Sequence, residues 1–143
     1  MKRLFFSTIA FVLFFTGCVS PAKSGINSIR ASIVNDAKKY LGTPYKYGGT
    51  TAAGFDCSGF TQFIYRKNNY DIPRTVTEMQ LSFKKTDNPG IGDIVTFKDP
   101  KHVGILVGGN KFIHASSSRG VVIDNLSDPW FKKRKTGYYT IFY

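Results

Sequence analysis

The period of the hydrophobic pattern changes in the middle of the chain, and this change limits the possible folds most strongly. Before Asn88-Pro89-Gly90, apolar residues recur at steps of three and four, which predicts helices. After that turn, short apolar runs bounded by turn residues predict strands. The expected helices cover residues 29–41, 57–65 and 73–83, and the expected strands cover residues 94–97, 102–107, 111–115, 121–123 and 138–143. Helices followed by an antiparallel sheet predict one α+β domain.

The first residues have the composition of a secretory signal peptide. Lys2 and Arg3 precede an almost wholly apolar stretch over residues 4–15, which is too short for a comfortable membrane span. A short membrane anchor or a buried hydrophobic segment is the alternative. We therefore expect a signal peptide over residues 1–17.

A lipid attachment site is expected directly after this signal. The sequence Phe15-Thr16-Gly17-Cys18 resembles a bacterial lipobox, with Phe15 where Leu is usual. The resemblance implies that Cys18 is lipidated and anchors the protein to a membrane. Residues 18–28, rich in Ser, Pro, Gly and Asn, are then expected to form a lipid-anchored tether before a folded domain over residues 29–143.

The charge of the chain favours anionic partners. The net charge is +11 at pH 7, and loss of Lys2 and Arg3 with the signal would leave +9. Basic proteins bind nucleic acid, anionic lipid or acidic polymers. A secreted lipoprotein does not normally meet nucleic acid, so anionic phospholipid and the acidic bacterial wall are the expected partners. The dense basic run over residues 132–135 is otherwise explained as a solvated face.

Cys57 is the first candidate for chemistry. The chain has two cysteines, so lipidation of Cys18 would leave Cys57 without a disulfide partner. Cys57 lies where a Gly-rich segment leads into an expected helix, and backbone N–H groups at a helix N-terminus favour the thiolate. An inert buried cysteine is the alternative. The position favours a nucleophile.

The two histidines of the chain, His102 and His114, lie on consecutive expected strands. A three-residue loop over residues 108–110 would pair Val107 with Lys111 and place both rings on one face of the sheet, as diagonal neighbours. A two-residue loop would place them on opposite faces. The relation between the two rings therefore depends on the turn.

Rings on one face would form a relay with the thiol. His102 would be the base that forms a thiolate–imidazolium pair with Cys57, and His114 would hold the His102 ring in the right tautomer. Two unrelated core histidines are one alternative, and a zinc site is another, although no C-x-x-C or H-x-x-x-H spacing supports zinc. The backbone N–H of Cys57 and a hydroxyl of Tyr45 or Tyr47 are candidate oxyanion donors, the tyrosines otherwise being wall aromatics.

Several motifs, in order, resemble those of the NlpC/P60 peptidases. The matching segments are Tyr40-Leu41-Gly42-Thr43-Pro44-Tyr45-Lys46-Tyr47-Gly48-Gly49, Phe55-Asp56-Cys57-Ser58-Gly59-Phe60, Pro73-Arg74-Thr75, and residues 92–97, 102–105 and 112–116. The resemblance covers residue 29 to the C-terminus, so residues 29–143 are expected to be an NlpC/P60 catalytic domain. With the lipobox, the arrangement is similar to the murein endopeptidase lipoproteins of Gram-negative bacteria.

This resemblance implies a papain-like α+β fold with N-terminal helices packed on an antiparallel sheet. It also implies hydrolysis of amide bonds in peptidoglycan stem peptides or cross-links. The residues it implies are Cys57 as nucleophile, His102 as base, His114 as the third catalytic residue, Tyr45 rather than Tyr47 as the loop tyrosine, and Asp56 and Ser58 as substrate contacts. No metal or other cofactor is expected.

The alternatives are an amidase or acyltransferase on the same fold, or a non-catalytic, lipid-anchored module that binds the wall. An intact set of one cysteine and two histidines argues against the non-catalytic alternative. In each case we expect a monomer in the cell envelope, anchored to a membrane that faces the periplasm; the outer membrane is favoured, with the inner membrane as the alternative.

Overall fold

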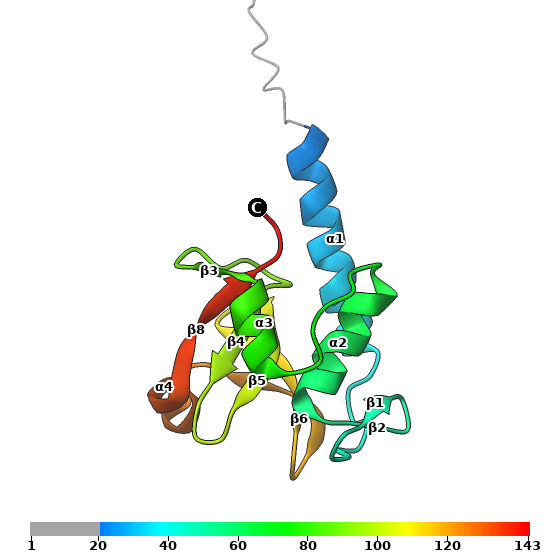
Figure 1. The fold of residues 1–143 in the computed structure, drawn as a ribbon, viewed down its shortest axis with the longest axis vertical. Helices are drawn as coiled ribbons and strands as arrows, with labels where there is room; N and C mark the ends of the chain where they lie inside the picture. Colours follow the sequence, from blue (N-terminus) through cyan, green and yellow to red (C-terminus); the bar gives the residue numbers. More distant parts are fainter. Residues whose placement is uncertain (1–20) are drawn as a thin grey trace, which may run out of the picture.

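The computed structural model describes residues 21–143, and the expected signal peptide and the lipidation site Cys18 lie outside the described residues. Helices and an antiparallel sheet form one α+β domain, as the change of period predicts (Figure 1). The helices are α1 (Pro21–Lys38), α2 (Cys57–Lys67), α3 (Val76–Ser82) and α4 (Pro129–Arg134). The strands are β1 (Thr50–Thr51), β2 (Gly54–Phe55), β3 (Lys84–Thr86), β4 (Ile94–Phe97), β5 (His102–Gly108), β6 (Lys111–Ser116), β7 (Gly120–Asn125) and β8 (Lys135–Thr140).

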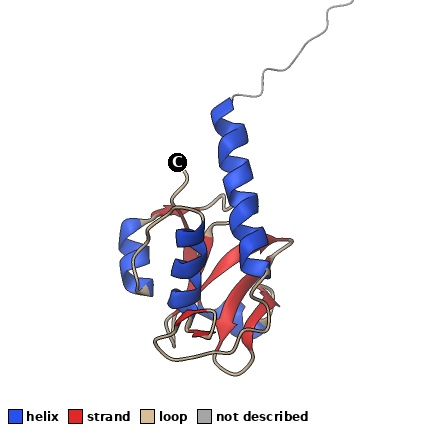
Figure 2. Ribbon diagram, turned by 90° about the vertical axis from the view of Figure 1, so that its right-hand side faces the viewer, coloured by secondary structure: helices blue, strands red, loops and turns tan. Residues whose placement is uncertain are grey.

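Six strands form the main sheet in the order β3-β8-β4-β5-β6-β7, and each pair is antiparallel. β1 and β2 form a separate small hairpin in the Gly-rich segment that precedes Cys57. Helices cover the sheet in the view of Figure 2. Among residues 21–143, no helix combines the length and the apolar character that a membrane crossing requires.

Alternate residues along the central strands divide between two apolar clusters, as the two-residue period of a strand requires. On one face, Ile105 and Ile113 pack with Ile33 of α1 and Ile64 of α2. The other cluster joins Val95, Phe97, Leu106, Phe112, Leu126 and Phe131, the last of them from α4. The expected packing of the N-terminal helices on the sheet is therefore confirmed, and α4 covers the second cluster.

α1 begins at Pro21, well before the helix start expected at residue 29. Residues 21–28 of the expected tether are therefore helical, although periodicity could not reveal it, because this segment has no repeating apolar positions. Proline fits the first turn of a helix, where its missing N–H costs no hydrogen bond. Figure 1 shows this end of α1 projecting beyond the sheet.

The β5–β6 hairpin reaches the expected register by a different route. Gly108 pairs with Lys111, so the loop has two residues, Gly109 and Asn110, rather than the three expected. A bulge at Val107 then shifts the register by one residue, so that Leu106 pairs with Phe112. A two-residue loop alone would place the two histidines on opposite faces of the sheet. The bulge cancels this effect, so both histidines lie on one face.

Three elements near the end of the sheet differ from expectation. β8 covers residues 135–140 rather than 138–143, and β3 and α4 were not expected. β3, a short edge strand of two lysines and a threonine, has no apolar residue to reveal it. α4 carries a local signal, because Asp128 caps it and Pro129 follows at the first position, but its six residues are too few for a periodicity.

Candidate active site

A cleft of about 450 Å³ brings together four of the residues predicted to carry chemistry: Tyr45, Cys57, His102 and His114. Cys57 is the first residue of α2, His102 is the first residue of β5, and His114 lies within β6. α4 contributes Trp130 and Phe131 to the wall. Within residues 21–143, no group of three Cys, His, Asp or Glu side chains is arranged to hold a metal ion.

The N-cap of α2 fixes the position of Cys57. The side chain of Asp56 accepts a hydrogen bond from the Gly59 N–H at 2.6 Å, which starts the helix directly at the cysteine. Burial raises the pKa of the Cys57 thiol, and the N–H groups of Val103, Ser58 and Cys57 lower it by less. The N–H groups at the helix start favour the thiolate, as expected, but burial and the Asp56 charge outweigh them and the net shift of the Cys57 pKa is upward.

The histidine rings are in direct contact. His102 Nε2 lies 2.7 Å from His114 Nδ1, with the two rings nearly perpendicular. His114 is 2% exposed and stacks on Phe112. Burial and the neighbouring His114 lower the pKa of His102 to about 3, and burial also lowers the pKa of His114. Both rings are therefore neutral near pH 7.

An acidic residue that the sequence analysis missed completes this chain of contacts. Asp124 Oδ2 lies 2.9 Å from His114 Nε2, and both carboxylate oxygens pair with the guanidinium of Arg119. Burial raises the pKa of Asp124, but the hydrogen bonds from Arg119 and His114 hold it below its ordinary value. The expected strand ended at Ile123, one residue before Asp124; with that strand extended, the two-residue period would have placed the acid beside His114.

The two candidate tyrosines differ in position. Tyr45 lines the cleft and forms a backbone bridge with Phe55, whereas Tyr47 is 92% exposed and is not among the described residues lining the cleft. Burial and the nearby thiol raise the pKa of Tyr45, so its hydroxyl remains a hydrogen-bond donor at neutral pH. Of the two tyrosines, Tyr45 is the one placed to reach a group bound at Cys57.

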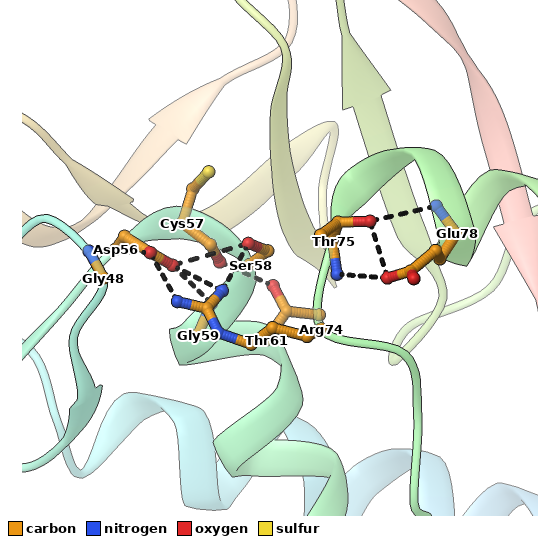
Figure 3. A network of polar contacts seen from close by, with 9 residues as sticks. All are labelled: Gly48, Asp56, Cys57, Ser58, Gly59, Thr61, Arg74, Thr75 and Glu78. Carbon is orange, nitrogen blue, oxygen red and sulfur yellow. Dashed lines mark hydrogen bonds and ion pairs between the residues drawn. The ribbon is translucent and has the colours of Figure 1, made fainter.

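Asp56 and Ser58 lie in a polar network beside the cleft, and neither is among the described residues that line it. Arg74 donates to both carboxylate oxygens of Asp56, at 3.0 and 2.6 Å, and to Ser58 Oγ at 2.8 Å. Burial raises the pKa of Asp56, but Arg74 and the N–H groups of Gly59 and Gly48 hold it below its ordinary value. Figure 3 shows the Cys57 sulfur pointing away from this network.

A cysteine at a helix start and a histidine on the adjoining antiparallel sheet, together in one cleft, define the papain-like class of thiol enzymes. The chain belongs to the NlpC/P60 family, whose sequence model matches residues 42–140. The resemblance inferred from the ordered motifs is thereby confirmed.

Named relatives agree with this assignment. The chain is 44% identical to the probable peptidoglycan endopeptidase LytE of Bacillus subtilis, over 75% of this chain and 33% of that protein. It is 37% identical to the murein DD-endopeptidase MepS/murein LD-carboxypeptidase of Escherichia coli, over 74% of this chain and 60% of that protein. The chain thus matches less than two thirds of the length of either relative.

The fold is likewise similar to a solved structure. An NlpC/P60 family protein from Bacillus cereus superposes with a TM-score of 0.76 at 29% identity, covering 80% of this chain and 40% of that one. The papain-like NlpC/P60 fold implied by the motifs is therefore confirmed.

Proposed function

We propose that the protein is a cysteine endopeptidase that hydrolyses amide bonds in peptidoglycan stem peptides or cross-links. The observation that carries this proposal is the joint placement of Cys57, His102 and His114 in one cleft. The names of the two relatives supply the substrate class, because both are described as enzymes that cleave peptidoglycan or murein.

The reaction follows from the protonation states of the resting site. The Cys57 thiol and the His102 ring are both neutral, so the thiol proton passes to His102 as sulfur attacks the carbonyl carbon. The backbone N–H of Cys57 and the Tyr45 hydroxyl stabilise the oxyanion. His102 then returns the proton to the leaving amine, and water hydrolyses the acyl-enzyme. His114 holds the His102 ring throughout.

Asp56 and Ser58 are proposed to contact the stem peptide on the Arg74 side of the thiol. Their polar atoms already meet Arg74, which fixes their positions before substrate binds. A Ser58→Ala variant should raise KM with little change in kcat, because such a contact contributes to binding in the ground state and the transition state alike. An unchanged KM would remove Ser58 from the binding site.

Removal of the nucleophile tests the proposal directly. We expect Cys57→Ala to abolish cleavage of purified muropeptides, detected by mass spectrometry, while circular dichroism and the Tm stay close to wild type. Ser82→Ala, a change of similar size at an exposed position at the end of α3, should leave cleavage unchanged. Full activity of Cys57→Ala would exclude the mechanism.

The same product masses identify the bond. An amidase would release intact stem peptides from the glycan, an acyltransferase would give products larger than its substrates, and an endopeptidase gives shortened or uncrosslinked stems. A wild-type protein that binds wall fragments but leaves their masses unchanged would be a non-catalytic wall-binding module.

The proposed location follows from the N-terminal sequence. A signal over residues 1–17 and a lipid on Cys18 would anchor a monomer to the periplasmic side of the outer membrane, within the cell envelope. Fractionation of a Cys18→Ser variant tests this location, because recovery of that variant in the membrane fraction at the wild-type level would exclude the anchor.

A further inference from the structure

His114 is held between two polar partners that come from the strands on either side of it. Its Nδ1 lies 2.7 Å from His102 Nε2 on β5, and its Nε2 lies 2.9 Å from Asp124 Oδ2 on β7. Because His114 is 2% exposed, water cannot easily replace either partner. Each ring nitrogen of His114 therefore has one defined role as donor or acceptor.

The positions of the protons can be derived from the carboxylate. Asp124 is ionised beside Arg119, and an ionised carboxylate only accepts hydrogen bonds, so His114 Nε2 must carry a proton. In a neutral ring the other nitrogen is then an acceptor. His114 Nδ1 therefore accepts a hydrogen bond, and His102 Nε2 is its donor.

The same reasoning fixes the reactive nitrogen of His102. A neutral ring that is protonated at Nε2 has its lone pair at Nδ1. We propose that Asp124, held by Arg119, is a positioning residue that sets the tautomer of both histidines and leaves His102 Nδ1 as the basic nitrogen for Cys57. This inference rests on the proposed function only for the catalytic roles of Cys57 and His102.

Loss of the carboxylate would permit the wrong tautomer. His114 could then be protonated at Nδ1 and donate to His102 Nε2, which would move the His102 proton to Nδ1. In that state His102 cannot accept the thiol proton. A wrong tautomer of the base is known to cost a large part of the rate in Ser-His-Asp enzymes, where an Asp→Asn change has this effect.

The carboxylate also acts during the proposed reaction without taking the proton. As the sulfur–carbon bond forms, the thiol proton moves to His102 Nδ1. The resulting imidazolium keeps the proton on its Nε2, which still donates a hydrogen bond to His114 Nδ1. The negative charge of Asp124 raises the pKa of His102, so it stabilises the imidazolium. Arg119 keeps Asp124 ionised, so the proton stays on His102 and returns to the leaving amine.

Nuclear magnetic resonance of the wild-type protein tests the tautomers directly. The chain has two histidines, so 15N-histidine labelling of protein without a histidine tag allows each ring nitrogen to be assigned. At neutral pH we expect protonated Nε2 and unprotonated Nδ1 in both His102 and His114. Protonation of His114 at Nδ1 would overturn the proposal, whether or not any variant folds.

Variants then test the carboxylate. In Asp124→Asn we expect Nδ1 protonation to appear in the histidines and the rate of Cys57 alkylation by iodoacetamide at pH 7 to fall about 10- to 100-fold, by analogy with the loss of carboxylates that orient metal-bound histidines. Asp124→Glu, which keeps a carboxylate, should recover part of that rate. Asp71→Asn is the matched control, because Asp71 also pairs with an arginine five residues away but is exposed and outside the cleft.

The outcomes separate this proposal from the proposed function. Alkylation and resonance measurements need no wall substrate, so a protein with the expected tautomers that does not cleave muropeptides would contradict the function and leave the role of Asp124 intact. Wild-type tautomers and a wild-type alkylation rate in Asp124→Asn would overturn the positioning role, even if muropeptides were cleaved.

Discussion

At the scale of single residues, burial controls the protonation of the site. Burial lowers the pKa of both histidines and raises the pKa of the Cys57 thiol, so it reinforces the neutral form of all three groups at pH 7. The proposed catalysis therefore begins from a neutral pair rather than from a preformed ion pair. The charges that form during the reaction are stabilised by groups already in place, namely the oxyanion donors and Asp124.

The lowered pKa of His102 predicts how stability depends on pH. The folded ring has a pKa of about 3, whereas an unfolded histidine titrates near 6.5. Between these values the unfolded chain binds a proton that the folded chain does not bind, so the free energy of unfolding should decrease as the pH falls from about 6.5 towards 3.

A His102→Gln variant isolates this contribution. Urea unfolding of both proteins across that pH range should show a free energy of unfolding that depends less steeply on pH in the variant. Carboxylates elsewhere titrate equally in both proteins, so the difference between the two curves belongs to His102. Parallel curves for the wild type and the variant would show that folding does not lower the pKa of His102.

At the scale of elements, close approach of backbones fixes α2 against the small hairpin region. A Cβ added to Gly59 of α2 would lie 2.1 Å from the carbonyl oxygen of Gly49, and the Asp56 carboxylate is also near. No real side chain fits there, so the first turn of α2, which carries Cys57, depends on this glycine.

Two glycine-to-alanine changes in helices should therefore have opposite signs. Gly59→Ala should lower the free energy of unfolding by at least about 2 kcal/mol, because the backbone of Gly49 must move. A Cβ added to Gly25 of α1 has no atom within 4 Å, so Gly25→Ala should raise the free energy of unfolding by about 0.5–1 kcal/mol through helix propensity. Chemical denaturation measures both, and equal effects would contradict the steric argument.

The sequence predicted the elements that have a clear apolar period, and it missed those that have none. Residues 94–97 form a strand with the expected bounds because all four are buried. β3 and the start of α1 have no such pattern, so local propensity and pairing decide them. In the site, Cys57 and the histidine pair were predictable from sequence position, but Arg74 and Asp124 were not assigned roles, because their partners are distant or on another strand.

At the scale of the whole molecule, Arg30 connects α1 to the rest of the fold. Its guanidinium lies 2.8 Å from Asp93 Oδ1, donates to the carbonyl oxygen of Ile91, and packs over the ring of Phe142 near the C-terminus. Asp93 is 1% exposed, so this ion pair is largely removed from solvent. One side chain thus joins the N-terminal helix, the segment before β4 and the chain end.

Loss of this arginine should be costly. Arg30→Met leaves the Asp93 charge buried without its counter-ion, which should lower the free energy of unfolding by about 3–5 kcal/mol. Arg66→Met is the control, because Arg66 and its partner Asp71 are both exposed and should contribute less than about 1 kcal/mol. Equal Tm values for the two variants would contradict this account.

The relay of His102, His114 and Asp124 draws one residue from each of three adjacent strands. Shifting one of these strands by a single position would turn its member to the opposite face of the sheet. A nascent or misregistered chain therefore lacks a competent base, even though its sequence is intact. The proposed hydrolysis therefore requires β5, β6 and β7 to be paired in this register.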